Sequence, residues 1–284
     1  MPQTAQELEK LAGDHRNNGE GLKAVEYYKQ AADTYLQEGN RQQAAGCWHM
    51  VGVSYKVEND IDAAIENLHK AADLNREIGN EIGVGRIYRD IGIAYAYRKE
   101  HEEAIKWLRK SVEALEGTGE DAELGISEAK VGLHYLEVHD YNQAEEWLNK
   151  GLATIRRTFH WFYEMTALLH LAALRFAQDR PSDAVTNLWA GVGLIFQAGE
   201  QEGQKRRLAQ LYGLLGQAYL GLGNTAGGVE FFAKAIQLLE PMADNVAKVV
   251  YEDIRATDFV RKLREKSSQD AKDLESKLDL SRLK

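Results

Sequence analysis

A repeat of about 40 residues constrains the fold of this chain more than any other feature of its sequence. In each copy, a small residue is flanked at helical spacing by large residues, and a second small residue follows. In the second copy, Trp48, Val51 and Tyr55 surround Gly52, and the second small residue is Ala64. The small residues that anchor the six copies, spaced by 40 four times and then by 44, are Ala12, Gly52, Gly92, Gly132, Ala172 and Gly216. So regular a spacing indicates stacked units of one kind.

Each copy has the pattern of two helices joined by a short turn. The small residues allow two helix backbones to approach closely, and large residues three or four positions away fill the space beside them. The dipeptides Gly39-Asn40, Gly79-Asn80 and Gly223-Asn224 are typical of helix ends, where a left-handed residue is needed. Only three prolines occur in 284 residues, which leaves room for long helices. The sequence therefore predicts an all-α fold of antiparallel helix pairs that must stack to bury their apolar faces.

The pattern resembles that of the tetratricopeptide repeat family over residues 5–240, with a period longer than the family's usual length of about 34 residues. The longer form is similar to the repeats of kinesin light chains, of mitotic spindle-orientation adaptors and of bacterial Rap-type peptide-sensing regulators. The resemblance implies a right-handed superhelical α-solenoid of about six helix pairs. It also implies a concave groove, lined by the first helix of each pair, in which function resides.

The pattern changes after the last repeat. We expect a solenoid over 1–240, one amphipathic capping helix over 241–266 that covers the open face of the last pair, and a tail over 267–284 that is helical or disordered. The tail carries three leucines that would lie along one side of a helix: Leu274, Leu278 and Leu283. Two interpretations of the tail stay open, a solvated end of the chain and a segment that docks on a partner or a second chain.

Charge and cysteine content narrow the class of protein. The net charge of −9 disfavours a general nucleic-acid binder, which needs a basic surface. A single cysteine allows no internal disulfide and implies no oxidising compartment. The first residues do not resemble a secretory signal, and there is no apolar run of about 18 residues for a membrane span. These features predict a soluble, cytoplasmic protein with neither nucleic acid nor membrane as a partner.

The family frame projects two groups of side chains into the groove. The basic group, from the first three copies, consists of Arg16, His49, Lys56, Arg86 and Arg89. The apolar group, from the fourth and fifth copies, includes Leu133, Leu136, Leu169 and Phe176. In the fifth and sixth copies the same projection adds Thr166, Ala173, Gln210, Gly213, Gln217 and Leu220. Such a groove fits a peptide with acidic residues beside hydrophobic ones, because a guanidinium binds a carboxylate in two parallel hydrogen bonds. The alternative is that the basic side chains pair with acidic residues of adjacent helices.

Neither a catalytic nor a metal-binding pattern is present. The eight histidines form no HExxH motif and no ligand pair with cysteine. Cys47 fits a buried structural thiol better than a nucleophile. The Lys–Asn carboxylate clamp of chaperone-docking relatives is missing, and Val53, Ile93 and Leu133 stand where extended-peptide binders have asparagine. We therefore expect no enzyme activity, no metal and no cofactor.

Two functions remain open from the sequence. The first is an interaction scaffold that binds a peptide or protein segment in the concave groove. The second is a regulatory solenoid of the Rap type that controls a signalling protein in response to a peptide. The partner and the oligomeric state are left open.

Overall fold

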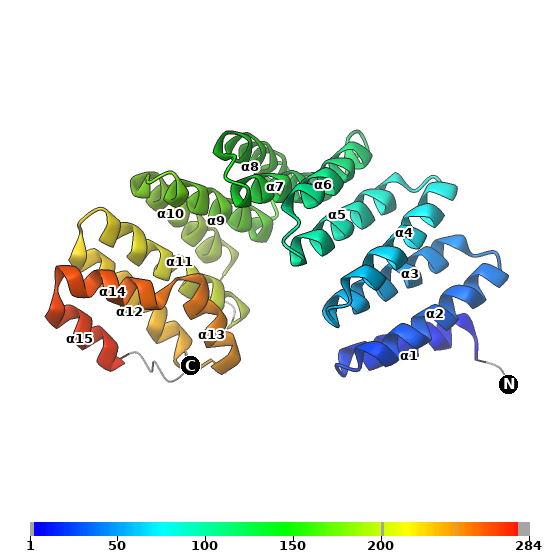
Figure 1. Ribbon diagram of the computed structural model, residues 1–284, viewed down its shortest axis with the longest axis horizontal. Coiled ribbons are helices and arrows are strands. Elements are labelled where there is room, and N and C mark those ends of the chain that lie inside the picture. Colours follow the sequence, from blue (N-terminus) through cyan, green and yellow to red (C-terminus); the bar gives the residue numbers. More distant parts are fainter. Residues whose placement is uncertain (1–2, 200–201, 243, 278–284) are drawn as a thin grey trace. The chain divides into compact units, whose positions relative to one another are not determined.

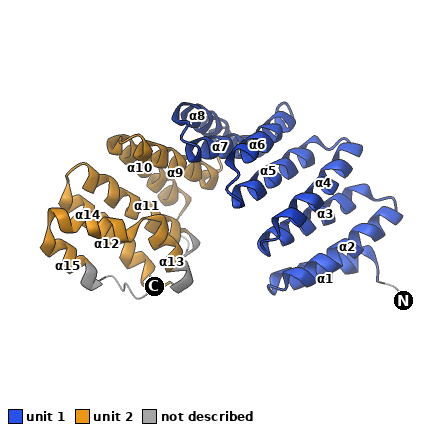
Figure 2. Ribbon diagram, viewed as in Figure 1, with its two compact units in different colours: residues 1–158 blue, residues 159–284 orange. Residues whose placement is uncertain are grey.

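The computed structural model describes residues 3–199, 202–242 and 244–277, which fold into fifteen α-helices without a strand. The chain divides into two compact units, unit 1 over residues 1–158 and unit 2 over 159–284 (Figure 2). The helices of unit 1 are α1 (Ala5–Asn17), α2 (Gly21–Gln37), α3 (Arg41–Val57), α4 (Ile61–Glu77), α5 (Glu81–Tyr97), α6 (His101–Leu115), α7 (Asp121–Glu137) and α8 (Tyr141–Arg156). The helices of unit 2 are α9 (Trp161–Ala177), α10 (Pro181–Ala198), α11 (Glu202–Gly221), α12 (Thr225–Leu239), α13 (Asp244–Asp253), α14 (Ala256–Lys266) and α15 (Ser268–Lys277).

The first twelve helices form six pairs, which confirms the predicted all-α solenoid. Within unit 1 each helix packs against the next from α1 to α8, and within unit 2 the same holds from α9 to α12 (Figure 1). The first helices α3, α5 and α7 also contact one another in sequence, so their side chains share one face of unit 1. In the described part of the chain, every helix falls short of the length and apolar content that crossing a membrane requires.

The anchoring glycines explain why the pairs pack so closely. A Cβ atom at Gly92 would lie 2.8 Å from Cγ of Leu108 and 3.1 Å from the carbonyl oxygen of Ala104 on the second helix. A Cβ atom at Gly132 would lie 3.0 Å from the carbonyl oxygen of Ala144. Because the main chain of the second helix occupies this space, only a very small residue fits at the frame position. The small residue that recurs in the sequence thus marks, in these pairs, the point where the backbones of the two helices come into contact.

Side-chain caps fix the starts of several helices. In each case a side-chain oxygen at the N-cap accepts a hydrogen bond from the main-chain N–H three residues later, as at Asn40, Asp60, Asn80, Asp140 and Asn224. The preceding Gly39 and Gly79 have φ values of 76° and 69°, so the predicted Gly-Asn helix ends are confirmed there. Each cap stabilises its helix by about 1 kcal/mol.

The end of the solenoid differs from the expected single capping helix over 241–266. Two helices, α13 and α14, are separated by Ile254 and Arg255, and Arg255 adopts the left-handed conformation at φ 48° and ψ 51°. For a residue with a Cβ atom this conformation costs on the order of 1 kcal/mol. The break is stabilised from α11, because Nε2 of Gln217 donates hydrogen bonds to the carbonyl oxygens of Ile254 (2.9 Å) and Arg255 (3.1 Å).

The C-terminal helices still cover the last repeat, as a cap must. The rings of Phe232 on α12 and Phe259 on α14 are stacked with centroids 4.0 Å apart, and both are fully buried. In the tail region, α15 buries Ala271 and Leu274 in the same cluster. The other two leucines of the tail stripe, Leu278 and Leu283, lie outside the described residues.

Candidate functional site

In unit 1, the basic residues projected into the groove meet acidic residues of the neighbouring first helix. Asp90 on α5 lies between His49 and Lys56 of α3, at 2.7 Å from Nε2 of His49 and 3.3 Å from Nζ of Lys56. Burial alone would raise the pKa of Asp90. The hydrogen bond from His49 and the charges of Lys56, His49 and Arg89 outweigh burial and hold that pKa at about 2. Asp90 is therefore a carboxylate at neutral pH, and the His49 ring donates to it.

A second carboxylate pairs with both arginines. Glu123 on α7 accepts a hydrogen bond from Nε of Arg86 at 2.9 Å and another from Nη1 of Arg89. Burial would raise the pKa of Glu123, but the two guanidinium groups lower it further than burial raises it. The interpretation in which these arginines pair with adjacent acids thus describes Arg86, Arg89 and Lys56.

Lys130 on α7 completes this set and has no acidic partner. It forms neither an ion pair nor a hydrogen bond with the described residues. Burial lowers the pKa of Lys130, the charges of Arg89 and Lys56 lower it further, and the charge of Asp90 opposes them. We call Lys56, Arg86, Arg89 and Lys130, with Asp90 and Glu123, the basic cluster. Its four cations and two carboxylates leave two positive charges uncompensated in a protein whose net charge is −9.

The other predicted residues of unit 1 lie outside these contacts. Arg16 on α1 is exposed, and its Nη1 atom lies 3.6 Å from Sδ of Met50. No ion pair joins Arg16 to the basic cluster within the described residues. Leu133 and Leu136 are half-buried on α7, the helix that carries Glu123 and Lys130. The apolar and basic residues of α7 are therefore presented by one helix.

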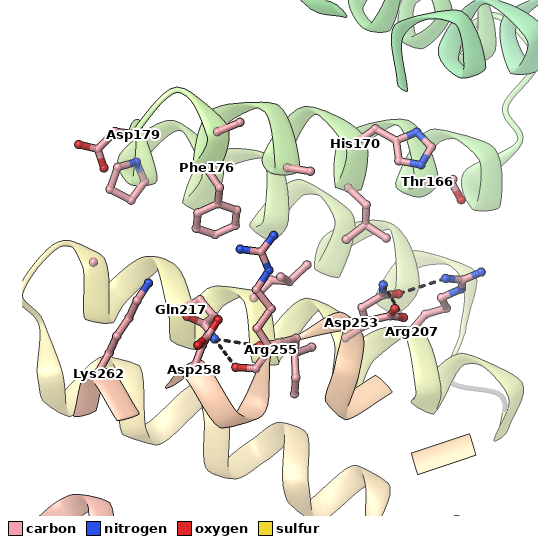
Figure 3. A pocket seen from close by; sticks show the side chains of 18 residues that line it. Thr166, His170, Phe176, Asp179, Arg207, Gln217, Asp253, Arg255, Asp258 and Lys262 are labelled. Atoms are coloured by element: carbon pink, nitrogen blue, oxygen red, sulfur yellow. Dashed lines mark hydrogen bonds between the residues drawn. The ribbon is translucent and has the colours of Figure 1, made fainter. Parts of the chain in front are cut away.

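Unit 2 contains a cavity of about 520 Å³ between α9, α11 and the ends of α13 and α14 that meet at Arg255 (Figure 3). Leu169 and Phe176 of α9 line it, with Leu214 of α11. Four of the other six residues projected into the groove of this unit also line it, namely Thr166, Ala173, Gln210 and Gln217, whereas Gly213 and Leu220 are not among the lining residues. Six of the eight residues that the family frame projects from α9 and α11 therefore line one cavity.

The polar wall of the cavity is ordered by a short chain of hydrogen bonds. Nη1 of Arg207 donates to Oε1 of Gln210 at 3.1 Å, and Nε2 of Gln210 donates to Oδ2 of Asp253 at 3.2 Å. Arg207 also lies over the ring of Phe162, 5.5 Å from its centroid. Burial lowers the pKa of Arg207, and burial raises the pKa of Asp253. This wall therefore carries partly desolvated charges of both signs.

The single cysteine lies outside these two places and has a packing role. Cys47 is fully buried, and burial followed by the charge of Glu9 raises the pKa of its thiol to about 12, so the thiol is protonated at neutral pH. Among the described residues, no group of three His, Cys, Asp or Glu side chains is placed to hold a metal ion.

The sequence projection missed several residues of both places. Asp90, Lys130 and His170 stand two positions before Gly92, Gly132 and Ala172, and the structure puts all of them in the basic cluster or the cavity lining. The 40-residue spacing that identified the other rows carried this signal too. Glu123 and Arg255 had no such signal, because their contacts depend on how neighbouring helices pack.

These helix pairs and their shared first-helix face define an α-solenoid of repeated helix pairs. The tetratricopeptide repeat pattern matches residues 47–117 and again residues 209–238. The chain is a tetratricopeptide repeat protein. A search of curated protein sequences finds no match.

Solved structures share the fold over nearly the whole chain. The apo form of RapI aligns with a TM-score of 0.71 at 16% identity and covers 96% of this chain and 99% of its own. A signal-transduction ATPase with a tetratricopeptide repeat sensor from Pyrococcus horikoshii aligns with a TM-score of 0.75 at 16% identity, over 96% of this chain and 41% of its own. Aspartyl phosphate phosphatase F from Bacillus subtilis gives a TM-score of 0.61 at 16% identity, over 84% of this chain and 60% of its own. This chain thus spans less than two thirds of the latter two proteins.

Proposed function

We propose that this protein is a non-catalytic interaction scaffold that binds a peptide or protein segment on the faces formed by its first helices. The ligand carries acidic residues, which contact the basic cluster of unit 1, and apolar residues, which contact Leu133 and Leu136. Unit 2 by itself offers a separate apolar surface for such a segment, at Leu169 and Phe176. The observation that carries the proposal is Lys130, a half-buried cation with a lowered pKa that forms no ion pair with any residue the structure describes.

The two carboxylates of the basic cluster compensate only part of its positive charge. A partly buried cation is costly unless an anion neutralises it. Asp90 already forms ion pairs with His49 and Lys56. Glu123 already forms ion pairs with both arginines of the cluster. A ligand carboxylate near Lys130 would find a desolvated cation that raises affinity more than an exposed lysine does. Arg86, Arg89 and Lys56 then contribute mainly by their long-range field, since their hydrogen bonds are largely used.

The experiment selects peptides from a random displayed library against the whole chain and compares two lysine variants. We expect the selected sequences to be rich in Asp and Glu beside apolar residues, and Lys130→Met to weaken their binding by about tenfold or more, as for loss of a charged hydrogen bond. The matched control is Lys106→Met on α6, where an exposed lysine pairs with Glu103 at 3.2 Å. Equal effects of the two variants, or selected peptides without acidic enrichment, would contradict the proposal.

The likeness to RapI over almost the full length of both chains supports a second candidate, a regulator that controls a signalling protein in response to a peptide. The two candidates differ in a measurable way. A scaffold binds one ligand on its first-helix face, whereas a regulator changes its affinity for a second protein when the peptide binds. Measuring whether a selected peptide alters binding of a co-purified protein separates them.

A further inference from the structure

The break between α13 and α14 is a built feature of unit 2. Ile254 is fully buried and fills the space beside Gly213, where a Cβ atom would lie 2.6 Å from Cδ1 of Ile254. The amide of Gln217 donates to the carbonyl oxygens of Ile254 and Arg255, and the oxygen of Arg255 also accepts the first main-chain hydrogen bond of α14, from the N–H of Phe259 at 3.0 Å. These contacts hold Arg255 in a left-handed conformation, although glycine or asparagine would adopt it at lower cost.

The break determines what Arg255 presents to the cavity. Figure 3 shows its guanidinium directed away from α11 into the cavity, towards Phe176 on α9, with the amine of Lys262 directed the same way. Within the described residues, neither side chain forms an ion pair or a hydrogen bond. Five other residues with a Cβ atom have a positive φ at helix ends, so the feature particular to Arg255 is the direction of its guanidinium into a cavity.

The carboxylates around the cavity are mostly engaged elsewhere. Asp253 accepts a hydrogen bond from Gln210, and Asp258 pairs with Arg261 at 3.2 Å. Asp179 lies in the exposed turn between α9 and α10. The part of the cavity near Phe176 therefore has two exposed cations, Arg255 and Lys262, without an ion-pair partner in the described part of the chain, beside an apolar wall. A ligand that contacts both the cations and the apolar wall must carry an anionic group close to an apolar group.

We infer that this cavity binds a carboxylate carried directly on an apolar residue, and that Arg255 is the group that pairs with the carboxylate. The C-terminal residue of a peptide has this chemistry, because its carboxylate and its side chain share one Cα atom. Leu169, Phe176 and Leu214 then contact the side chain, and a volume of about 520 Å³ is ample for it. The inference deepens the proposed function and rests on it in taking a peptide as the ligand.

The test compares N-acetyl-L-leucine with N-acetyl-L-leucinamide, which differ only in the carboxylate, by NMR titration of the whole chain. We expect the acid to bind at least about tenfold more tightly than the amide. Arg255→Gln should abolish this preference. Arg255→Gly should abolish it as well while keeping the fold, because glycine adopts φ 48° freely. The matched control is Arg41→Gln on α3 of unit 1, which removes an exposed arginine that does not line the cavity.

Three outcomes would overturn the inference: no binding of the acid to the wild-type chain at millimolar concentration, equal binding of acid and amide, or a preference that survives in both Arg255 variants. Hexanoate serves as a further arm. If it binds as tightly as the acyl amino acid, the assignment to a peptide end is wrong. Each of these outcomes leaves the peptide selection with Lys130→Met unaffected, so failure here is distinguishable from failure of the proposed function.

Discussion

Replacing Asp90 by asparagine tests whether the basic cluster carries an internal counter-ion. The side chain of Asp90 is 17% exposed, and those of its partners Lys56 and His49 are 13% and 29% exposed. The pKa of Asp90 falls from 3.8 to about 2 on folding. At about 1.4 kcal/mol per pKa unit, the ionised carboxylate stabilises the fold by roughly 2.5 kcal/mol after its burial is included. Asp90→Asn should therefore lower the free energy of unfolding by about that amount.

The sign of the pH dependence follows from the lowered pKa. A group whose pKa is depressed by folding contributes its stability above its unfolded pKa, and that contribution is lost as pH falls through the folded value. The difference between wild type and Asp90→Asn should be constant above about pH 5 and shrink as pH falls from about 5 towards 2. Urea unfolding followed by circular dichroism measures it through the midpoint at constant slope.

Two further variants make this result decisive. Asp62→Asn is the matched control, because Asp62 is 89% exposed in its pair with Arg98 and such pairs contribute less than about 1 kcal/mol. Adding Lys130→Met to Asp90→Asn should restore part of the lost stability, since it removes a cation whose nearest opposing charge is Asp90. The same Asp90 variant should bind selected acidic peptides more tightly. If Asp90→Asn costs no more than Asp62→Asn, the counter-ion reasoning is refuted.

Two other predictions concern packing and protonation. Gly92→Ala should lower the free energy of unfolding by about 1–3 kcal/mol, because the added Cβ meets Leu108 and the backbone of α6, whereas Gly46→Ala, with open space around it, should raise it by up to about 1 kcal/mol. Urea midpoints that move in the same direction would contradict this reading of the frame. His134 is buried, and burial, then the charges of His101 and Lys130, lower its pKa from 6.5 to about 4. Stability should therefore fall by up to about 3 kcal/mol as pH drops from about 6.5 to 4, and urea unfolding of His134→Gln should show a smaller fall.

The repeated part of the fold was predictable because each of its signals is local. Gly92 and Ala104 indicate where the backbones of α5 and α6 approach each other. The pair Gly79-Asn80 indicates the end of α4 and the start of α5. The break at Arg255 had no local signal. Neither glycine nor proline occurs between 242 and 266, and the apolar period runs on across the break. What stabilises it is an amide 38 residues earlier in the chain, at Gln217.

The candidate site was predictable to the extent that the repeat frame fixes direction. Phe176 and Gln217, which the frame projected into the groove, line one cavity, whereas Gly213 and Leu220, projected by the same rule, do not. The frame gave no account of charge compensation, because an ion pair such as Arg89 with Glu123 forms between helices 34 residues apart in sequence and depends on their packing. The sequence therefore predicts where the basic side chains lie. Whether they are free to bind a ligand depends on the acidic residues of the neighbouring helix.

Both units satisfy most of their own first-helix polar groups, and this sets what a ligand can gain. In unit 1, Asp90 and Glu123 occupy the hydrogen-bonding positions of His49, Lys56 and the two arginines. In unit 2, Gln217 stands in the position after the frame glycine, where relatives hold a ligand backbone, and instead holds this chain's own carbonyl groups. A ligand that competes for these contacts replaces one hydrogen bond by another and gains little. Under the two proposals, affinity then comes from cations without an ion pair among the described residues, such as Lys130 and Arg255, and from the apolar surface beside them.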